Sequence, residues 1–239
     1  MKKAKILLII PAYNEEENIL RTYGKIIDYN KKNKTNYDVI VINDGSTDNT
    51  KQLLENNNIP HISLIENLGI GGAVQTGYKY AKKYGYDIAV QFDGDGQHDI
   101  NYVKSIIKPI VDNKANMVIG SRYIDKNTSE FKSTFSRRIG IKLISFFIKL
   151  FTGKKIYDTT SGFRACDNNL IDYYSNEYPL EYPEPITTTR VIKKGFKVSE
   201  VGVSMNERTA GKSSIGSWKN AYYMFNVILS IITTGGKNE

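Results

Sequence analysis

Short apolar runs alternate with helix-spaced segments through the first half of this 239-residue chain, and the alternation limits the folds open to it. The runs are too uniformly apolar for strands with one wet face, which indicates strands buried on both sides. The predicted strands cover 5–10, 37–42, 62–65, 87–92 and 115–120, and the predicted helices cover 15–30, 46–54 (N-cap Ser46 or Thr47), 72–84 and 100–112. This order predicts an α/β fold with a mostly parallel central sheet flanked by helices.

A polar or glycine-rich segment follows each of the first four predicted strands. These segments are 11–15, 43–46, 67–72 and 93–98. In open parallel sheets the carboxyl ends of the strands meet at one edge, and ligands bind there. The sequence therefore predicts one binding site at this edge, built from four separate segments.

The segment after the fourth strand, residues 91–98 (QFDGDGQH), places two carboxylates one residue apart. Asp93 and Asp95 offer oxygen ligands only, which suit Mg2+ or Mn2+, and Mg2+ commonly combines one or two carboxylates with substrate phosphates. The pair therefore predicts a divalent cation and a substrate that carries a diphosphate. The alternative is an Asp- and Gly-rich turn with no ligand. His98 could be a third ligand, but ions that prefer oxygen do not need imidazole.

Composition restricts the partners and the compartment. The formal net charge of +8 predicts an anionic partner: a nucleic acid, an anionic membrane surface or a phosphorylated small molecule. The chain has no aromatic and basic RNA-binding signature and no zinc-finger spacing, so a nucleic acid is not expected. The single cysteine, Cys166, cannot form an internal disulfide and no signal segment opens the chain, which favours the cytoplasm.

Four motifs, at 11–15 (PAYNE), 43–48 (NDGSTD), 67–77 and 93–98 (DGDGQH), resemble in order and spacing those of family 2 glycosyltransferases with the nucleotide-sugar-binding A-type fold. Segments at 120–123 (GSRY), 160–164 (TSGFR) and 207–213 resemble the polyprenyl-phosphate branch of that family, which includes the dolichyl-phosphate mannose synthases. The resemblance implies a Rossmann-like fold and a metal-dependent transferase. It also implies transfer of a sugar from a nucleoside diphosphate with inversion at the anomeric carbon.

The resemblance assigns residues to the donor. It implies that Asp93 and Asp95 hold the ion, that Gln97 lies beside them at the reaction site and that Asp44 reads the nucleotide base. UDP is the expected nucleotide, because a small pyrimidine suits an Asp that accepts a base N–H. The alternative for Asp44 is an Asx-turn into the next helix. The other nucleotide-binding candidates are Pro11, Ala12, Tyr13, Glu15, Gly69, Gly71 and Gly94, together with Asp93.

The acceptor decides what else the site needs. A sugar hydroxyl requires a general base, whereas a phosphate monoester already carries a nucleophilic oxyanion, because its second pKa is about 6. A phosphate acceptor needs cations to position it, and the candidates are Arg122, Arg164, Arg208 and Lys212, each with a surface ion pair as the alternative. The chain departs from the branch at Ile186, where relatives carry a Glu. Glu184 or Glu181 is the available substitute.

Two apolar segments suggest how a lipid acceptor is reached. Residues 137–151 have the pattern of a basic amphipathic helix, with Lys142, Ser145 and Lys149 on a narrow polar stripe and apolar residues over the rest. Residues 218–232 are also apolar and aromatic but fall short of the ~20 residues that span a membrane. Both are predicted to lie at a membrane interface, and the alternative is a core or dimer-interface helix.

The expected organisation is a catalytic domain at 1–212, with a nucleotide-sugar half at 1–125 and an acceptor half at 126–212. A C-terminal helical acceptor-side extension, an amphipathic or interfacial helix and tail, follows at 213–239. The predicted activity is inverting transfer of a sugar from an NDP-sugar, with UDP favoured, to a polyprenyl phosphate by an enzyme peripheral on the inner face of the cell membrane. A small membrane protein or a second copy of the chain is a further expected partner.

Two alternative functions fit the same motifs. One is a glycosyltransferase that extends a surface polysaccharide by acting on a sugar hydroxyl. The other is a nucleotide-sugar-binding protein that has lost catalysis, which the absence of Glu at position 186 keeps open and the intact Asp93 and Asp95 disfavour.

Overall fold

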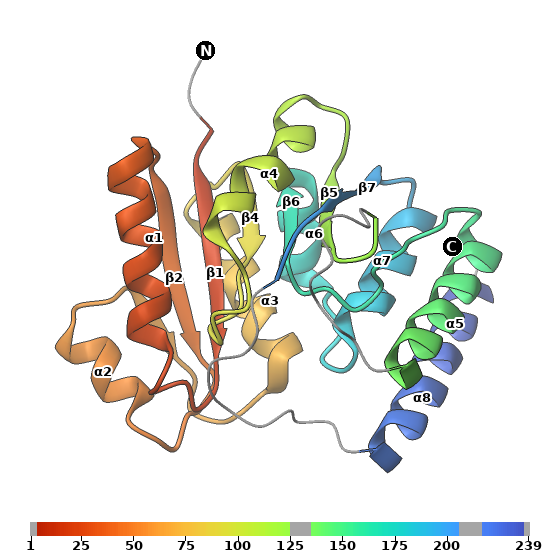
Figure 1. Ribbon diagram of the computed structural model, residues 1–239, viewed down its shortest axis with the longest axis horizontal. Coiled ribbons are helices and arrows are strands. Elements are labelled where there is room, and N and C mark those ends of the chain that lie inside the picture. Colours follow the sequence, from red (N-terminus) through yellow and green to blue (C-terminus); the bar gives the residue numbers. More distant parts are fainter. Residues whose placement is uncertain (1–3, 125–134, 206–216, 237–239) are drawn as a thin grey trace.

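The computed structural model describes residues 4–124, 135–205 and 217–236. Through this part of the chain runs one seven-stranded sheet in the order β3-β2-β1-β4-β6-β5-β7 (Figure 1). The strands are β1 (Ile6–Ala12), β2 (Tyr37–Asn43), β3 (His61–Ser63), β4 (Ile88–Gln91), β5 (Met117–Ser121), β6 (Arg164–Asp167) and β7 (Val198–Gly202).

The sheet is parallel except at β6, which confirms the mostly parallel sheet predicted from the sequence. β1 pairs in parallel with β2 and β4, β2 with β3, and β5 with β7. β6 lies antiparallel between β4 and β5, and its first residue, Arg164, pairs with Gln91 at the end of β4. The carboxyl end of β4 therefore meets the amino end of β6 at the edge where the site is expected.

Helices cover both faces of the sheet (Figure 1). One face carries α1 (Ile19–Asn33), α2 (Thr50–Asn56) and α4 (Val103–Val111), which follows a 3-10 turn at Ile100–Tyr102. The other face carries α3 (Gly69–Lys83), α5 (Phe135–Thr152), α6 (Asn168–Asn176), α7 (Pro183–Lys193) and α8 (Ser217–Gly236).

Alternate residues of β1 pack into two separate hydrophobic cores, one on each face of the sheet. Leu8 and Ile10 pack into the cluster that includes α1 and α4, whereas Leu7 and Ile9 pack into the cluster that includes α3 and α6. All four side chains are fully buried. A strand covered on both faces must be apolar at every position, which is the physical reason for the uniform runs in the sequence.

Three predicted helix boundaries were wrong by three or four residues. α1 begins at Ile19 instead of residue 15, α3 begins at Gly69 instead of residue 72, and α2 begins at Thr50. Neither Ser46 nor Thr47 is the N-cap of α2. Their backbone and side-chain groups bond to the loop after β1 instead, so contacts between distant segments override the local capping signal.

Helix α5 confirms the amphipathic helix predicted at 137–151, and the structure shows which side is buried. Ile144 and Ile148 pack into the core, while exposed apolar side chains recur on the opposite side at a spacing of four, three and four residues. These are Ile139, Leu143, Phe146 and Leu150. Phe147, next to the exposed Phe146, is half-buried and packs against the core. Ser145, predicted on the polar stripe, is buried because its hydroxyl donates to the carbonyl of Ile156.

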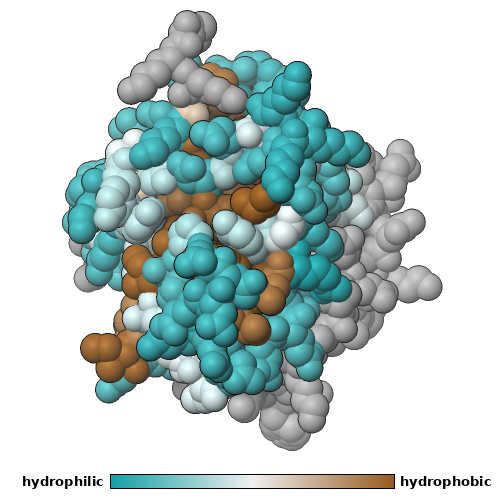
Figure 2. Space-filling model, turned by 90° about the vertical axis from the view of Figure 1, so that its left-hand side faces the viewer, coloured by the Kyte–Doolittle hydropathy of each residue, from teal (hydrophilic) through white to brown (hydrophobic). Residues whose placement is uncertain are grey.

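Helix α8 packs against α5 and α7. Among its described side chains, Val227 and Ile231 are buried, whereas Phe225, Leu229 and Ile232 are exposed. We call the seven exposed apolar side chains described on these two helices, four on α5 and three on α8, the α5/α8 face. These helices lie at the β7 end of the sheet (Figure 1), far from the side drawn in Figure 2, where hydrophilic residues predominate and hydrophobic residues show between them.

Two substitutions on α5 test which side of this helix faces the core. Ile148→Ala removes a fully buried side chain and should lower the free energy of unfolding by about 2–5 kcal/mol. Leu150→Ala, at a side chain that is 62% exposed, should change it by no more than about 0.5 kcal/mol. Urea denaturation measures both, and equal losses would contradict this orientation of α5.

Candidate active site at the carboxyl edge of the sheet

The two acids after β4 differ in their environment. The side chain of Asp93 is 31% exposed, whereas Asp95 is buried and its Oδ1 accepts a hydrogen bond of 3.0 Å from the backbone N–H of Gln97. Gly94, between them, accepts a hydrogen bond from the Thr22 hydroxyl through its carbonyl (3.0 Å). The side chain of Asp93 is therefore partly open to solvent, and the loop is hydrogen-bonded to α1 through Gly94.

His98 closes this loop from inside the protein. Its Nδ1 accepts a hydrogen bond from the backbone N–H of Asp93 (2.9 Å), and its Nε2 lies 3.4 Å from Oδ2 of the same residue. The ring stacks on Phe163 at 4.6 Å between centroids. Burial lowers the pKa of His98 to about 4, so the ring is neutral at pH 7. These contacts hold the loop in its conformation. They also occupy Nδ1 of His98, which argues against His98 as a third metal ligand.

The loops after β1 and β2 are joined by hydrogen bonds into one wall of the site. The backbone N–H of Asn14 donates to the Ser46 hydroxyl (3.0 Å), and its side-chain oxygen accepts from the N–H of Thr47 (2.8 Å). The N–H of Glu15 donates to the Thr50 hydroxyl (2.9 Å). Asn14 has a φ of 54°, a left-handed conformation that Asn tolerates better than most residues.

The predicted nucleotide-binding residues at the end of β1 lie together with Gly94. Pro11 and Ala12 are buried, Glu15 is half-buried and Tyr13 is 48% exposed. A Cβ at Gly94 would lie 3.3 Å from the carbonyl oxygen of Pro11. The ends of β1 and β4 therefore pack closely, and Tyr13 is the side chain most open to a ligand in this group.

Asp44 is buried at the end of β2 and holds the start of α3. Its Oδ1 accepts a hydrogen bond of 2.8 Å from the N–H of Leu68, and its own N–H donates to the carbonyl of Ala12 (2.8 Å). Burial raises the pKa of Asp44, while the backbone donors of Leu68 and Gly69 lower it. The carboxylate is thus bonded to the following glycine-rich turn rather than to an Asx-turn of its own, and base recognition by Asp44 stays a prediction.

Two glycines at the start of α3 are required by geometry. Gly69 has a φ of 76°, in the left-handed region. A Cβ at Gly71 would lie only 2.3 Å from the carbonyl oxygen of Pro179 and 2.4 Å from that of Leu180. The loop between α6 and α7 therefore rests directly on the helix N-terminus where a phosphate is expected.

Arg122 is buried in a bidentate ion pair instead of lying open to an acceptor. Its Nε and Nη2 each donate to Asp158 at 2.8 Å, and Nη2 also donates to the Thr160 hydroxyl (3.0 Å). Burial lowers the pKa of Arg122, but the hydrogen bonds and charge of Asp158 raise it by more. The Glu200 carboxylate accepts from the N–H groups of Tyr157 and Asp158, at 2.8 Å each, so the pair is anchored to β7.

Arg164 is also buried, at the start of β6. Its Nε donates to the carbonyl of Ser161 (2.7 Å), and its Nη1 donates to the carbonyl of Glu184 (2.8 Å). The same Nη1 reaches the hydroxyls of Thr187 and Thr188, at 3.1 and 3.0 Å. The guanidinium therefore fastens the first turn of α7 to the sheet. Direct phosphate binding by either arginine stays a prediction, and Arg208 and Lys212 lie outside the described residues.

A second polar cluster lies beside Asp93. Gln91 donates a hydrogen bond to the Glu184 carboxylate, whose pKa is raised by burial and lowered by the charge of Arg164. A Cβ at Gly162 would lie 2.9 Å from Nε2 of Gln91 and 3.2 Å from Oδ2 of Asp93. Gly162 therefore packs against both Gln91 and Asp93, and Glu184 belongs to the same cluster through Gln91, whereas Ile186 is buried.

The carboxylates fit a hard divalent cation. Within the described ranges, no group of three or more His, Cys, Asp and Glu side chains has an arrangement that could hold a metal. Asp93 and Asp95 would therefore supply the protein ligands, and other oxygens would complete the shell, as Mg2+ prefers when it binds with phosphates.

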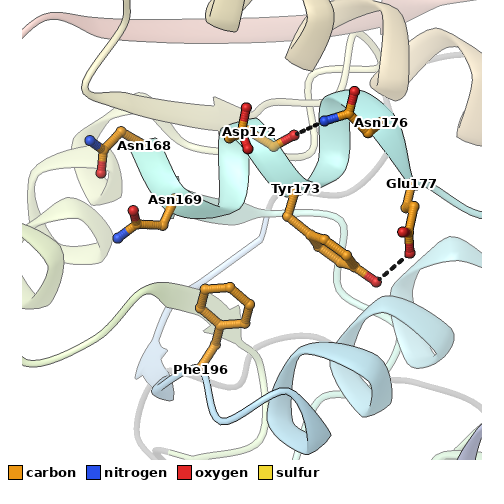
Figure 3. Close-up of a pocket in the computed structure, with 7 residues that line it drawn as sticks. All are labelled: Asn168, Asn169, Asp172, Tyr173, Asn176, Glu177 and Phe196. Atoms are coloured by element: carbon orange, nitrogen blue, oxygen red, sulfur yellow. Dashed lines mark hydrogen bonds between the residues drawn. The ribbon is translucent and has the colours of Figure 1, made fainter. Parts of the chain in front are cut away.

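An open cleft of about 600 Å³ lies away from these residues, on α6 (Figure 3). Its lining residues are Asn168, Asn169, Asp172, Tyr173, Asn176, Glu177 and Phe196. The Tyr173 hydroxyl donates to Glu177 (3.1 Å), and the Asn176 amide donates to the carbonyl of Asp172 (2.9 Å). The cleft contains none of the residues predicted from the motifs.

Comparison with known proteins identifies the family. The sequence model described as glycosyl transferase family 2 matches residues 7–174. The chain belongs to this family. It is 33% identical over 212 residues, 81% of this chain and 82% of the relative, to the UDP-N-acetylglucosamine–dolichyl-phosphate N-acetylglucosaminyltransferase of Methanococcus voltae. It is 27% identical to the polyprenol monophosphomannose synthase of Mycolicibacterium smegmatis, over 93% of this chain and 85% of the relative.

The fold of this glycosyltransferase has solved counterparts. Glucosyl-3-phosphoglycerate synthase from Mycobacterium tuberculosis, crystallised with Mn2+, UDP-glucose and phosphoglyceric acid, matches with a TM-score of 0.68 at 17% identity. The match covers 99% of this chain and 81% of that one. The predicted A-type glycosyltransferase fold and the resemblance to the polyprenyl-phosphate branch are thereby confirmed.

Sequence reasoning missed several residues that build the glycosyltransferase site. Gln91, Asp158 and Glu200 are buried or half-buried polar residues in strands or loops. Only Gln91 carried a signal, because a polar residue ended an otherwise apolar run. Asp158 and Glu200 lie 36 and 78 positions from Arg122, and nothing in their local sequence indicates the pairing.

The lowered pKa of His98 predicts a loss of stability in acid. Unfolded His titrates near 6.5 and the folded residue near 4, so the unfolded chain binds the extra proton between these values. Stability is therefore complete above pH 6.5 and falls by about 3 kcal/mol as the pH drops to 4. Urea denaturation of metal-free protein across this range should show the loss, which His98→Gln should reduce.

The matched control is His61→Gln, which alters the chain's other histidine and should keep the full pH dependence. An unchanged pH profile in His98→Gln would show that other groups cause the acid destabilisation.

Proposed function

We propose that this glycosyltransferase moves a sugar from a UDP-sugar to a polyprenyl phosphate at a membrane surface, with Mg2+ or Mn2+ as cofactor. The observation that carries the proposal is the combination of a carboxylate pair at the end of β4 with an exposed apolar, basic helix surface. The relatives named for dolichyl-phosphate and polyprenol substrates support the same acceptor class.

The donor half of the proposal rests on the site geometry. Asp93 and Asp95 would hold the cation, which when bound neutralises the negative charge that grows on the departing nucleoside diphosphate. Tyr13 is exposed beside them for the nucleoside, and Asp44 lies at the adjacent strand end. The N-terminus of α3 would attract the diphosphate through its helix dipole, although the N–H groups of Leu68 and Gly69 already donate to Asp44 and Asn67.

The α5/α8 face supports a lipid acceptor. Seven large apolar side chains are exposed there, four on α5 and three on α8. Arg138, Lys142 and Lys149 are exposed on α5, and neither helix sequence contains an acidic residue. An apolar surface flanked only by positive charge is complementary to an anionic bilayer surface, where interfacial helices bury about 5–10 Å deep. Among the described residues, no helix has the length and apolarity needed to cross a membrane.

With a phosphate acceptor, the site does not need a general base. A phosphate monoester is already an oxyanion at neutral pH, so its attack on the sugar needs no residue to remove a proton. The site must instead supply a cationic side chain that binds the phosphate. Arg208, between β7 and α8 in the sequence, is the cation we propose for this role.

The first test addresses the metal and donor. Asp95→Asn should abolish sugar transfer and remove most Mn2+-dependent UDP binding, because the loop loses a ligand charge at a site with few other protein ligands. Calorimetry and a transfer assay with UDP-glucose, UDP-N-acetylglucosamine or GDP-mannose, with and without undecaprenyl phosphate, measure both effects.

The control variant Lys51→Gln, at an exposed residue of α2, should leave both sugar transfer and Mn2+-dependent UDP binding unchanged. Full transfer by Asp95→Asn, or by the wild type in excess chelator, would contradict the metal assignment. Efficient glycosylation of an oligosaccharide without lipid phosphate would replace the polyprenyl acceptor with the polysaccharide alternative.

The second test addresses the membrane surface. Replacing Phe146 and Phe225 with Ser should weaken binding to vesicles of phosphatidylglycerol and phosphatidylcholine at least tenfold, because two large side chains leave the interface. Vesicle co-sedimentation measures this. Tyr84→Ser, at an exposed aromatic of α3, is the control. Undiminished vesicle binding by the double variant would show that the α5/α8 face does not contact the membrane.

A further inference from the structure

The site is laid out in a line along the sheet edge. The nucleotide candidates lie at the ends of β1 and β2, and the carboxylate pair lies at the end of β4, the next strand along. A nucleotide sugar that follows this line places its sugar beyond the metal, toward β6 and the start of α7. The residue found at that position is Glu184, coupled to both Gln91 and Asp93.

The protein fixes Glu184 from two directions. Arg164 holds its backbone carbonyl at 2.8 Å, and Gln91 donates to its carboxylate. The chain reaches this position through Tyr182, whose φ of 51° is a left-handed conformation that is costly for an aromatic residue. Backbone strain of this kind persists where surrounding contacts over-determine it, and here it turns the first residues of α7 toward the site.

The cluster under Glu184 holds two unsatisfied polar atoms. Oε1 of Gln91 and Nη2 of Arg164 are buried without a hydrogen-bond partner, on side chains that are 1% and 2% exposed. Buried polar atoms without a partner are uncommon and call for an explanation. Glu184, in contrast, is a half-buried residue and keeps some exposure to solvent.

The arrangement of the carboxylates does not favour Glu184 as a metal ligand. Among the described residues, Asp93, Asp95 and Glu184 do not form a three-carboxylate group that could hold an ion. A carboxylate held beside Asp93 and partly open is instead suited to accept hydrogen bonds from hydroxyl groups, which sugars offer in pairs.

We propose that Glu184 binds a hydroxyl group of the donated sugar and thereby selects which sugar is transferred, with Gln91 and Arg164 as positioning residues. The inference rests on the proposed function, since it places the sugar of an NDP-sugar next to the carboxylate pair.

The test separates the sugar from the nucleotide. Glu184→Gln should lower affinity for the NDP-sugar that the donor panel identifies by about 10- to 100-fold, because a charged hydrogen bond to a hydroxyl is lost. Affinity for the matching nucleoside diphosphate with Mn2+ should stay within about twofold. The unchanged nucleotide affinity also reports that the variant is folded. Calorimetry gives both values.

Monodeoxy analogues of the donor identify the contacted hydroxyl. The wild type should lose affinity for one analogue, and Glu184→Gln should bind that analogue and the parent sugar equally, since the interaction is already absent. Glu184→Asp should restore part of the selectivity. The matched control is Glu181→Gln, an exposed acid on the same loop, which should behave as the wild type.

Three outcomes would overturn the proposal. Equal loss of nucleotide and NDP-sugar affinity would place Glu184 in the metal or nucleotide site. Wild-type affinity of Glu184→Gln for both the nucleotide and the NDP-sugar would show that Glu184 does not contact the donor. If that variant bound the donor normally but did not transfer the sugar, Glu184 would act on the acceptor side. Failure of the wild type to bind any NDP-sugar would instead contradict the proposed function itself.

Discussion

Two buried arginines on the antiparallel side of the sheet hold the active-site edge in place. A guanidinium cannot stay buried unless its charge and donors are satisfied, so each one fixes the groups around it. Arg122 holds the loop that contains Asp158 and Thr160, and Arg164 holds the first turn of α7. Both segments end against the β4 loop, so the position of the carboxylate pair depends on contacts made by residues that need not touch a substrate.

The two sides of the site are built by different means. On the β1/β2 side, short loops are bonded to each other through backbone N–H groups and small polar side chains. On the β6/β5/β7 side, the buried Arg122–Asp158 ion pair and carboxylate–backbone bonds, such as that from the N–H of Asp158 to Glu200, hold the segments together. The first kind of wall depends on neutral hydrogen bonds between neighbouring loops. The second depends on charges in a low-dielectric interior, where the loss of one partner costs far more than the pair contributes.

The parts of this structure that the sequence predicts are those determined locally. Uniform apolar runs predicted strands buried on both faces, and the spacing of residues 137–151 predicted an amphipathic helix, although it did not show that Ser145 would be buried. Residues grouped at strand ends, such as Asp93 and Asp44, were correctly placed at one edge because parallel topology alone brings them there. The family motifs then supplied the chemistry that the pattern could not.

The remaining features depend on distant partners and are not encoded in any local pattern. Arg122 was expected to be open to a phosphate, but its partner Asp158 lies 36 residues away and buries it. The start of α2 moved because Ser46 and Thr47 bond to the β1 loop. Glu184 and Glu181 could not be distinguished from sequence, because the left-handed turn at Tyr182 decides which of them faces the site.

The order of elements across the sheet gives the reaction a direction. Nucleotide candidates lie at β1 and β2, the carboxylate pair at β4, Glu184 beside β6, and the apolar helices beyond β7. In the function proposed above, a donor bound along this line would present its anomeric carbon away from the nucleotide, toward the α5/α8 side. An acceptor that arrived from a membrane under that side would approach opposite the leaving diphosphate, as transfer with inversion requires. The proposed lipid surface, sugar site and stereochemistry would then all follow from the strand order of the sheet.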